Sequence, residues 1–344
     1  MPSSHRPLKR ALLAAPVMLA LSAGCAPTTE GDTQPDTASL VDTAAEEMGF
    51  SVVTSELAQG VLLSAWSDAD ELLMVGGELG GEGILARYDG DRLCVEEAVA
   101  DTALWWIHGP RDGEWYAVGS QGRIVHEVDG ERTREDVETN ATLFGVYADG
   151  ERVWAVGGDV SNNTGEIWRR EDGAWSLFAG DLPGLMFKTW EGWFVGDGQS
   201  YRLEGDELVP HDTDGARLVT VRGRDAESDT WAVGGSSSAV VMRFEGEGWE
   251  PVEQELGQPL NGVWTAPGEP VYVAGNSGTT AFYQDGQWVK PDAPVTMEVL
   301  HAVWPHGDEV IWVGGNLMTT SGDYYGTIVR YGERRDALTP EVCP

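Results

Sequence analysis

The chain has 344 residues and a formal net charge of −35, and only three of its residues are lysines. A field of this sign repels nucleic acid and anionic lipid surfaces, so the composition excludes a polyanion-binding protein. The 45 glycines and 15 tryptophans exclude a disordered chain, which would be poor in aromatic residues, and they favour many short strands joined by tight turns.

Residues 1–25 are predicted to be an export signal. A basic start precedes the apolar run ALLAAPVMLALSAG at residues 11–24, which is too short to span a bilayer but suits the apolar part of a signal peptide. The run leads directly to Cys25, and small residues before a cysteine resemble the bacterial lipobox, in which that cysteine is lipidated. Ser22 stands where lipoboxes usually carry leucine, with Leu21 one place earlier. A plain secretory signal with a chance cysteine is the alternative.

The residue after the cysteine and the segment that follows indicate where the protein would reside. Ala26 follows Cys25, and the resemblance to lipoproteins then implies an outer-membrane lipoprotein of the cell envelope, periplasmic or surface-facing. Without lipidation the protein would be secreted. Lipid chains on Cys25 would make the membrane a partner. Residues 26–48 are rich in Thr, Asp and Ala and lack apolar periodicity, so they are predicted to be a flexible tether.

A step that reads VGG or a close variant recurs through the rest of the chain. Its first glycines are Gly76, Gly119, Gly157, Gly196, Gly234, Gly275 and Gly314. The successive intervals are 43, 38, 39, 38, 41 and 39 residues. A repeat of about 40 residues matches the length of a four-stranded propeller blade, and seven copies predict seven blades.

Each repeat unit has the same internal pattern, which the unit at residues 143–182 illustrates. A short apolar strand, LFGVY (143–147), is followed by the continuous apolar run VWAVGG (153–158), which suits a strand covered on both faces. A third strand alternates apolar and polar residues, and a DG turn leads to the more polar WSLFAGDL (175–182). We therefore predict an all-β fold, a seven-bladed β-propeller with four-stranded antiparallel blades over residues 49–344.

The two ends of the repeat region predict how the ring closes. The seventh unit lacks a fourth strand, whereas GFSVVTSELAQG (49–60) precedes the first unit and resembles the fourth strands of other units. We expect residues near 50–57 to supply the outer strand of the last blade. Blade seven then lies beside blade one, so Cys94 and Cys343 are expected to form a disulfide, which export to an oxidising compartment permits. Two unrelated free thiols are the alternative.

The repeat consensus resembles that of bacterial secreted β-propellers. The pattern [LF]-x-[GA]-V-W … V-W-A-V-G … G-x-I-x-R-x-D-G-x-W is similar to the photosystem II stability/assembly-factor-like and sialidase-repeat-like groups, and to propeller lipoproteins of soil bacteria. The resemblance covers roughly residues 49–344 and implies the propeller fold. The sialidase-type motif S-x-D-x-G-x-x-W is not reproduced, since the turns read DGAW (172–175) and DGQW (285–288), and no Trp-Asp dipeptide occurs. Sialidase and WD40-type roles are therefore not implied.

Motifs for catalysis, metals or cofactors are not found. The histidines form no H-x-H, H-E-x-x-H or Cys-His ligand spacing, and His301 occupies a first-strand position that suggests a structural role. We therefore predict no catalytic, cofactor-binding or metal-binding residues and a chain that is not an enzyme. The alternative is a carbohydrate-active enzyme, a glycosidase or lyase, with a pair of carboxylates in the central funnel.

Two insertions between the second and third strands predict a binding face. Unit three carries GDVSNNTGE (158–166) and unit seven carries NLMTTSGDYYG (316–326), and insertions in repeat arrays cluster on one face. The candidate contact residues are Asn162, Asn163, Met318, Asp323, Tyr324 and Tyr325. Tryptophans at equivalent repeat positions are expected to pack between blades rather than to bind sugar. We predict a monomeric, non-catalytic binding or scaffold module for an envelope protein or glycan; an assembly factor for a membrane complex is a further alternative.

Overall fold

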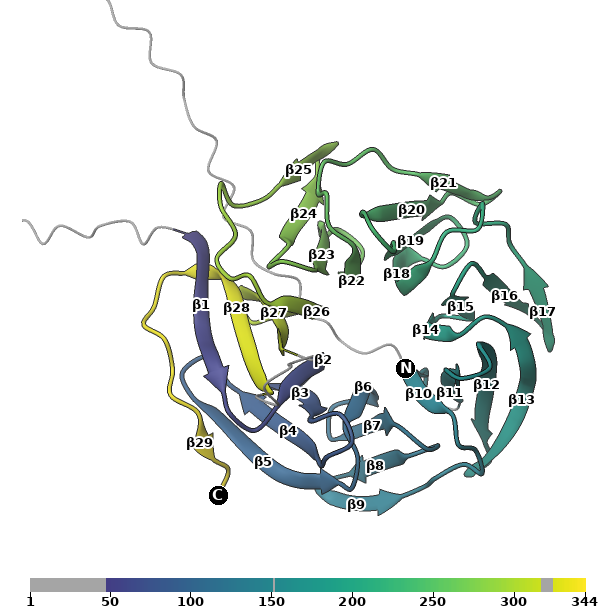
Figure 1. Ribbon diagram of the computed structural model, residues 1–344, viewed down its shortest axis with the longest axis horizontal. Helices are drawn as coiled ribbons and strands as arrows, with labels where there is room; N and C mark the ends of the chain where they lie inside the picture. Colours follow the sequence, from purple (N-terminus) through teal and green to yellow (C-terminus); the bar gives the residue numbers. More distant parts are fainter. Residues whose placement is uncertain (1–47, 151, 317–323) are drawn as a thin grey trace, which may run out of the picture. The chain divides into compact units, whose positions relative to one another are not determined.

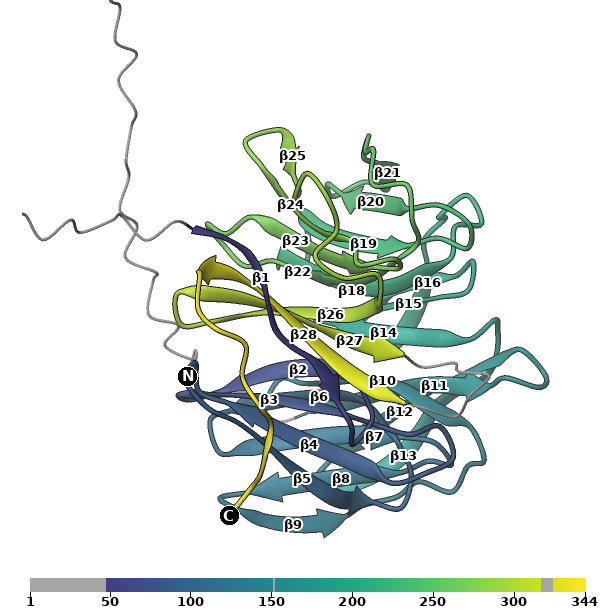
Figure 2. The ribbon, with the colours of Figure 1, turned by 60° about the vertical axis from the view of Figure 1, so that its left-hand side comes forward.

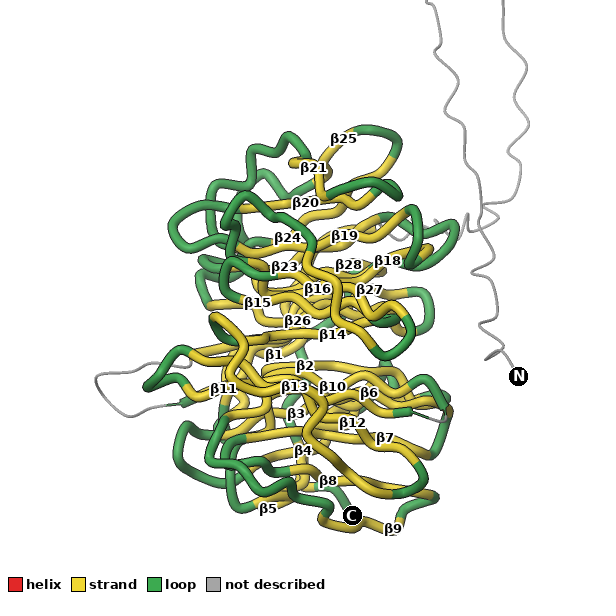
Figure 3. Tube along the Cα trace, turned by 90° about the vertical axis from the view of Figure 1, so that its right-hand side faces the viewer, coloured by secondary structure: helices red, strands yellow, loops and turns green. Residues whose placement is uncertain are grey.

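The computed structural model describes residues 48–150, 152–316 and 324–344. Seven antiparallel sheets stand around a central axis (Figure 1), six of four strands and one of five. The described residues form strands and loops and no helix (Figure 3). The prediction of an all-β, seven-bladed β-propeller is confirmed. No helix among the described residues is long and apolar enough to cross a membrane.

Each blade contains an inner, a second, a third and an outer strand. The inner strands are β2 (Val61–Asp68), β6 (Leu104–Arg111), β10 (Thr142–Ala148), β14 (Met186–Trp190), β18 (Leu218–Asp225), β22 (Leu260–Trp264) and β26 (Val299–His306). The second strands are β3 (Glu71–Gly77), β7 (Glu114–Gly119), β11 (Val153–Asp159), β15 (Trp193–Gly196), β19 (Asp229–Gly234), β23 (Val271–Gly275) and β27 (Glu309–Asn316). The third strands are β4 (Gly83–Tyr88), β8 (Ile124–Val128), β12 (Thr164–Glu171), β16 (Ser200–Glu204), β20 (Val240–Phe244), β24 (Thr280–Gln284) and β28 (Tyr325–Glu333). The outer strands are β5 (Leu93–Ala100), β9 (Glu131–Arg134), β13 (Ala174–Pro183), β17 (Glu207–Pro210), β21 (Trp249–Pro251), β25 (Gln287–Val289) and β1 (Met48–Leu57).

The recurrent glycines are required by a close approach of the backbone. Each inner strand has an irregular register with its neighbour directly after the Leu or Met that pairs with the first glycine of the second strand, as at Leu62/Ser64 and Leu300/Ala302. A Cβ added to the first glycine of each VGG step would lie 1.8–2.6 Å from a carbonyl oxygen at the start of the inner strand. The second glycine of three of these steps, Gly77, Gly235 and Gly315, has a positive φ. The first glycine is instead required by the close packing of the two backbones.

Aromatic residues of the second strands form the core between blades. Trp115, Trp154, Trp193, Trp231 and Trp312 are at most 2% exposed. Four of the indole N–H groups donate to protein oxygens, for example that of Trp115 to the Glu127 carboxylate at 3.0 Å. The prediction that tryptophans at equivalent repeat positions pack between blades is confirmed for Trp154, Trp193 and Trp231, each three residues before the first glycine of its step. Trp115 and Trp312 pack between blades from other positions of their strands.

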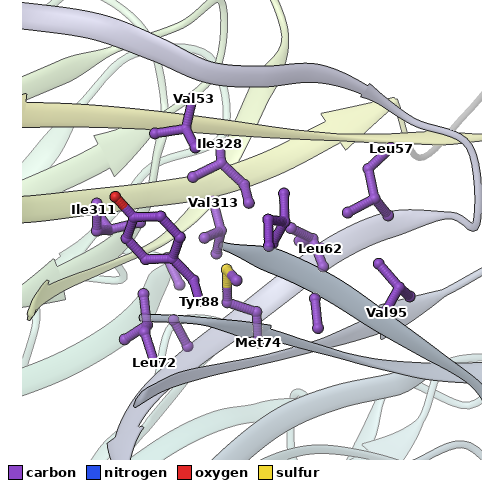
Figure 4. Close-up of a cluster of buried hydrophobic side chains, with 14 of the residues drawn as sticks. Val53, Leu57, Leu62, Leu72, Met74, Tyr88, Val95, Ile311, Val313 and Ile328 are labelled. Atoms are coloured by element: carbon purple, nitrogen blue, oxygen red, sulfur yellow. The ribbon is translucent and has the colours of Figure 1, made fainter. Parts of the chain in front are cut away.

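The ring closes where the N-terminal strand joins the last blade. β1 pairs antiparallel with β28, from Met48↔Glu333 to Leu57↔Gly326, in the sheet order β1-β28-β27-β26. In Figure 1, β1 lies beside β28 although the two are at opposite ends of the sequence. Val53 and Leu57 of β1 are fully buried in a cluster that joins blades seven and one (Figure 4). The expected outer strand near residues 50–57 is therefore confirmed.

The C-terminal segment also contacts the junction between blades seven and one, which we call the seam, on its outer side. It follows β1 and β5 (Figure 2), and the N–H of Leu338 donates to the carbonyl of Val53 at 2.7 Å. A short strand, β29 (Glu341–Val342), then pairs parallel with β5 as the fifth strand of blade one. Cys343 follows and forms a disulfide with Cys94, with 4.9 Å between the Cα atoms. The disulfide was expected from the sequence, whereas β29 was not.

A buried polar network lies inside this seam. The Tyr88 hydroxyl donates to Glu309 Oε2 at 2.7 Å, while Arg330 and Arg335 place guanidinium nitrogens 3.7 and 3.6 Å from Glu309 Oε1. Arg330 is 1% exposed and also donates to Ser51 Oγ. The pKa of Tyr88 is raised, mainly by burial and secondly by the hydrogen bond to Glu309. The network therefore links the N-terminal strand, blade seven and blade one with charge-assisted contacts.

Candidate functional site

The two faces of the ring differ in the segments that they carry. We call the face at which the inner strands start the start face, and the opposite one the end face. Because the strands are antiparallel, the start face also carries the loops between second and third strands and the connections from one blade to the next. The predicted insertion between β11 and β12 belongs to the start face, as do the described ends of β27 and β28 and the connections such as residues 290–298.

The irregular register places one residue of each inner strand at the start-face end of the axis. These bulged residues are Leu63, Trp105, Phe144, Phe187, Val219, Asn261 and His301. Trp105, Phe144 and Phe187 contact one another across three blades, with ring centroids 5.2 and 5.6 Å apart. The Arg217 guanidinium lies 4.6 Å from the Phe187 ring centroid. Three neighbouring blades therefore carry aromatic rings at this end of the axis, and the other four carry a leucine, a valine, an amide and an imidazole.

A small cavity lies on the axis and is lined by all seven inner strands. The space open to the centre of a water molecule is about 20 Å³, which accommodates roughly one water-sized particle. The polar or charged lining side chains are His108, Tyr147, Lys188, Thr189, Thr220 and Arg222, together with the indoles of Trp106, Trp190 and Trp304. No lining residue is Asp or Glu. A glycosidase mechanism needs two carboxylates, so this cavity does not provide the arrangement that the carbohydrate-active alternative requires.

Lys188 is the central cation of the cavity wall. Its side chain comes from blade four and passes Gly145 of blade three, where a Cβ would meet the lysine backbone and stem at 3.0–3.1 Å. Nζ donates to the carbonyl oxygen of Phe144 at 2.6 Å and lies 4.2 Å from the Trp106 ring centroid. Lys188 is 8% exposed. Burial lowers its pKa from 10.5 to about 7, because no carboxylate compensates the desolvation of the ammonium group.

The end-face side of the axis is closed by one large residue from each blade. This end-face plug comprises Trp66, His108, Tyr147, Trp190, Arg222, Trp264 and Trp304. The Arg222 guanidinium lies 5.0 Å from the Trp304 ring centroid and 5.9 Å from that of Trp264. Tyr147 Oη donates to Glu191 Oε1 at 2.5 Å. Burial, and then that bond, raises the pKa of Tyr147. The channel is therefore filled by side chains rather than open.

The two histidines at the axis are neutral. Burial and then Arg222 hold the pKa of His108 well below 6.5, and its Nδ1 accepts the N–H of Ala148 at 3.2 Å. Burial and then Lys188 lower the pKa of His301 to about 4. The Nε2 atom of His301 is buried and has no hydrogen-bond partner among the described residues. His301 is one of the bulged residues at the axis, and its structural role stays a prediction.

The predicted loop residues lie on the start face but in separate blades. Asn162 and Asn163 form the exposed turn between β11 and β12, where the Asn162 amide donates to Asp159 Oδ2 at 2.6 Å. The backbone bond from Ser161 is the main cause that lowers the pKa of Asp159. Tyr324 and Tyr325 are half-buried at the start of β28 in blade seven. No contact joins the two pairs among the described residues. Cys25, Met318 and Asp323 lie outside the described residues.

Tyr325 connects two start-face segments of neighbouring blades. Its hydroxyl donates to Glu298 Oε1 at 2.8 Å, which raises the pKa of Tyr325. Glu298 belongs to the connection between blades six and seven, next to Met297, which is 71% exposed. Leu79 and Val160, in the second-to-third strand loops of blades one and three, are 40% and 64% exposed. Among the described residues, the other exposed large apolar side chains belong to the outermost strands.

Sequence reasoning missed the axial cations. A signal existed, because Lys188 stands in the apolar strand MFKTW of a chain with three lysines. The corresponding residues of the other inner strands are Ser64, Trp106, Gly145, Thr220, Gly262 and Ala302. Within the described residues, no group of three or more His, Cys, Asp or Glu side chains is arranged to hold a metal ion.

Comparison with known proteins places the chain by its fold. No family model matches it, and no curated protein matches it either. Among solved structures, YCF48 bound to D1 peptide is similar, with 15% identity and a TM-score of 0.61 over 82% of this chain and 96% of that one. YCF48 from Cyanidioschyzon merolae has 14% identity and a TM-score of 0.59 over 82% and 98%. The WD40 β-propeller domain of Doa1 has 11% identity and a TM-score of 0.59 over 82% and 97%. At these identities the likeness shows the propeller fold alone.

Proposed function

We propose that this protein is an exported, lipid-anchored β-propeller of the cell envelope that acts as a non-catalytic binding or scaffold module for a protein segment. The binding surface is the start face. The observation that carries the proposal is the distribution of exposed apolar side chains. Away from the outermost strands, Leu79, Val160 and Met297 all lie on that one face, in blade one, blade three and the connection between blades six and seven. A partner that covered this face would remove these apolar side chains from water.

The residues around the axis favour a partner that binds to the start-face loops over a substrate that reacts at the centre of the ring. The end-face plug and the small cavity leave no room for a substrate at the centre, and the cavity wall lacks carboxylates. A partner would therefore contact the loops around the start face, where Asn162, Asn163, Tyr324 and Tyr325 supply hydrogen-bonding groups. Backbone amides of a protein segment suit these amide and hydroxyl groups.

The comparisons support a protein partner at the level of analogy. One similar structure, YCF48, is described as bound to the D1 peptide. Another is the extracellular domain of the hybrid two-component system BT4673 from B. thetaiotaomicron, with a TM-score of 0.60 and 10% identity over 85% of this chain and 40% of that chain. Assembly of a membrane complex is the more specific form of this proposal. The disulfide is consistent with export, because such bonds persist in oxidising compartments.

The binding proposal is tested by capture from a native envelope fraction with the full-length protein. Val160→Ser and Met297→Ser should each lower recovery of the same captured protein by several-fold. Leu177→Ser is the matched control, because Leu177 is 52% exposed but lies on the outer strand β13, and it should leave recovery unchanged. Equal recovery with all three variants would contradict the start face as the binding surface. Turnover of a glycan panel without any captured protein would favour the enzyme alternative.

The anchoring proposal is tested separately through Cys25. Intact-mass analysis of the membrane-extracted protein should show a lipid-modified N-terminal cysteine, and Cys25→Ala should release the chain into the soluble envelope fraction. If the mature wild-type chain is unmodified, begins at a residue other than Cys25 and is found in the soluble fraction, residues 1–25 contain a plain secretory signal and the protein is not a lipoprotein. The capture result does not depend on this outcome.

A further inference from the structure

The axial cavity presents hydrogen-bond donors without acceptors to match them. His108 Nδ1 accepts a backbone N–H, and the imidazole is neutral, so its proton is on Nε2, which makes this nitrogen a donor. Arg222 makes no hydrogen bond among the described residues, and its Nε is buried without a partner. The Thr189 hydroxyl is also unpartnered, in a residue that is 6% exposed.

Lys188 adds a charge to this donor set. One of its three N–H groups donates to the Phe144 carbonyl and another side of the ammonium faces the Trp106 ring, which leaves donor capacity for a further ligand. The hydroxyls of Tyr147 and Thr220 use their protons on Glu191 and on the Asn261 carbonyl. The lining therefore contains two cationic side chains, neutral donors and no carboxylate or carboxamide acceptor.

We propose that this cavity binds a single monoatomic anion, with chloride as the abundant example, held by Lys188, the Thr189 hydroxyl and the donors of the end-face plug. A buried ammonium without a counter-charge is costly, and an anion in the same low-dielectric space offsets that cost. The cavity accommodates about one water-sized particle, which favours a halide over sulfate or phosphate. A water molecule is the competing occupant, and it would supply acceptor lone pairs but no charge.

The net charge of the chain does not prevent this site. The charge of −35 resides mainly in surface carboxylates, and at physiological ionic strength the field of exposed charges is screened beyond about 8 Å. Contacts inside the cavity are screened far less, because side chains from all seven blades separate it from bulk solvent. The local donors therefore dominate the potential that the anion experiences.

Thermal unfolding of the full-length protein tests the site. Sodium chloride is compared with sodium gluconate at equal ionic strength, and chloride at about ten times its dissociation constant should raise the melting temperature by roughly 2 °C. Lys188→Met should lose the part of this difference that comes from the bound anion and keep only the general effect of the two salts. Lys290→Met should preserve it, because Lys290 is exposed and contacts only the Glu255 carbonyl. Subtracting the Lys188→Met response removes the general effects of the two salts on burial.

A second variant and a direct measurement keep the proposal falsifiable if Lys188→Met fails to fold. Thr189→Val removes one donor with little change of shape and should reduce the chloride response. Crystals grown with bromide should show an anomalous peak on the axis, between Lys188 and the end-face plug. Equal melting temperatures in the two salts together with no axial bromide would show that only water occupies the cavity and would overturn the proposal. A chloride response as large in Lys188→Met as in the wild-type protein would also overturn it.

Discussion

Replacing Lys188 by methionine removes the charge at the centre of the ring while the length of the side chain is kept. Burial lowers the pKa of Lys188 from 10.5 in its ordinary state to about 7 in the folded protein. Between these two values the unfolded chain binds a proton that the folded chain does not bind, so the stability of the wild-type protein rises with pH in this window. Below about pH 7 both states are protonated and the contribution of Lys188 is constant.

The size of the effect follows from the two pKa values. Their difference corresponds to roughly 5 kcal/mol, which accumulates at about 1.4 kcal/mol per pH unit. The free energy of unfolding of the wild type, minus that of Lys188→Met, should therefore increase by about this amount between pH 7 and pH 10.5. Groups that both proteins share cancel in this difference, so the titration of Lys188 remains.

The assay is urea unfolding followed by tryptophan fluorescence at several pH values in a buffer without halide. Lys290→Met is the matched control, and its difference from the wild type should stay flat across the same range, because Lys290 is exposed. A flat difference for Lys188→Met would refute the reasoning, because it would show that the ammonium keeps its ordinary pKa. A bound chloride raises the pKa of Lys188 in the folded protein. Adding chloride should therefore move the lower limit of the pH range over which stability rises to a higher pH.

Three further predictions concern the seam that closes the ring. Cys94→Ser should lower the free energy of unfolding by up to about 5 kcal/mol, because the disulfide closes a loop of 249 residues; urea unfolding with and without reductant measures this, and no change on reduction would contradict it. Glu309→Gln should cost about 3–5 kcal/mol by leaving Arg330 buried without its counter-charge, and an unchanged melting temperature would exclude that role. Leu57→Ala should cost about 2–5 kcal/mol as measured by urea unfolding, whereas a much smaller loss would mean that β1 contributes little to closure.

The architecture was predictable because each repeat unit contains the same order of strand patterns and turns within about 40 residues. The VGG steps mark where a second strand meets the start of an inner strand, and they recur at nearly constant spacing. The missing fourth strand of the last unit and the spare strand at residues 49–60 predicted the closure that β1 makes. β29 could not be predicted, because Glu341–Val342 is too short to show a strand pattern. It pairs with β5 directly beside the disulfide.

The candidate sites were only partly predictable. Loop insertions identified Asn162 and Asn163 on the start face, because extra residues between two paired strands must leave the sheet. The axial cavity could not be found in the same way. Lys188 and His108 are 80 residues apart in the sequence and meet only because successive inner strands are placed around one axis. A pattern search along the chain does not bring such residues together.

The seven repeat units also provide an internal comparison that separates folding from specialisation. Positions that pack between blades vary little: the inner-strand residue paired with the first glycine of the second strand is Leu in six units and Met in one. The bulged positions at the axis instead carry Leu, Trp, Phe, Phe, Val, Asn and His, although their backbone irregularity is the same in all seven units. A fold that needed only a packed axis could use similar small apolar residues in every unit. The chemical differences at the axis, with a lysine and an arginine among aromatic rings, therefore mark the part of this propeller that the repeat itself does not explain.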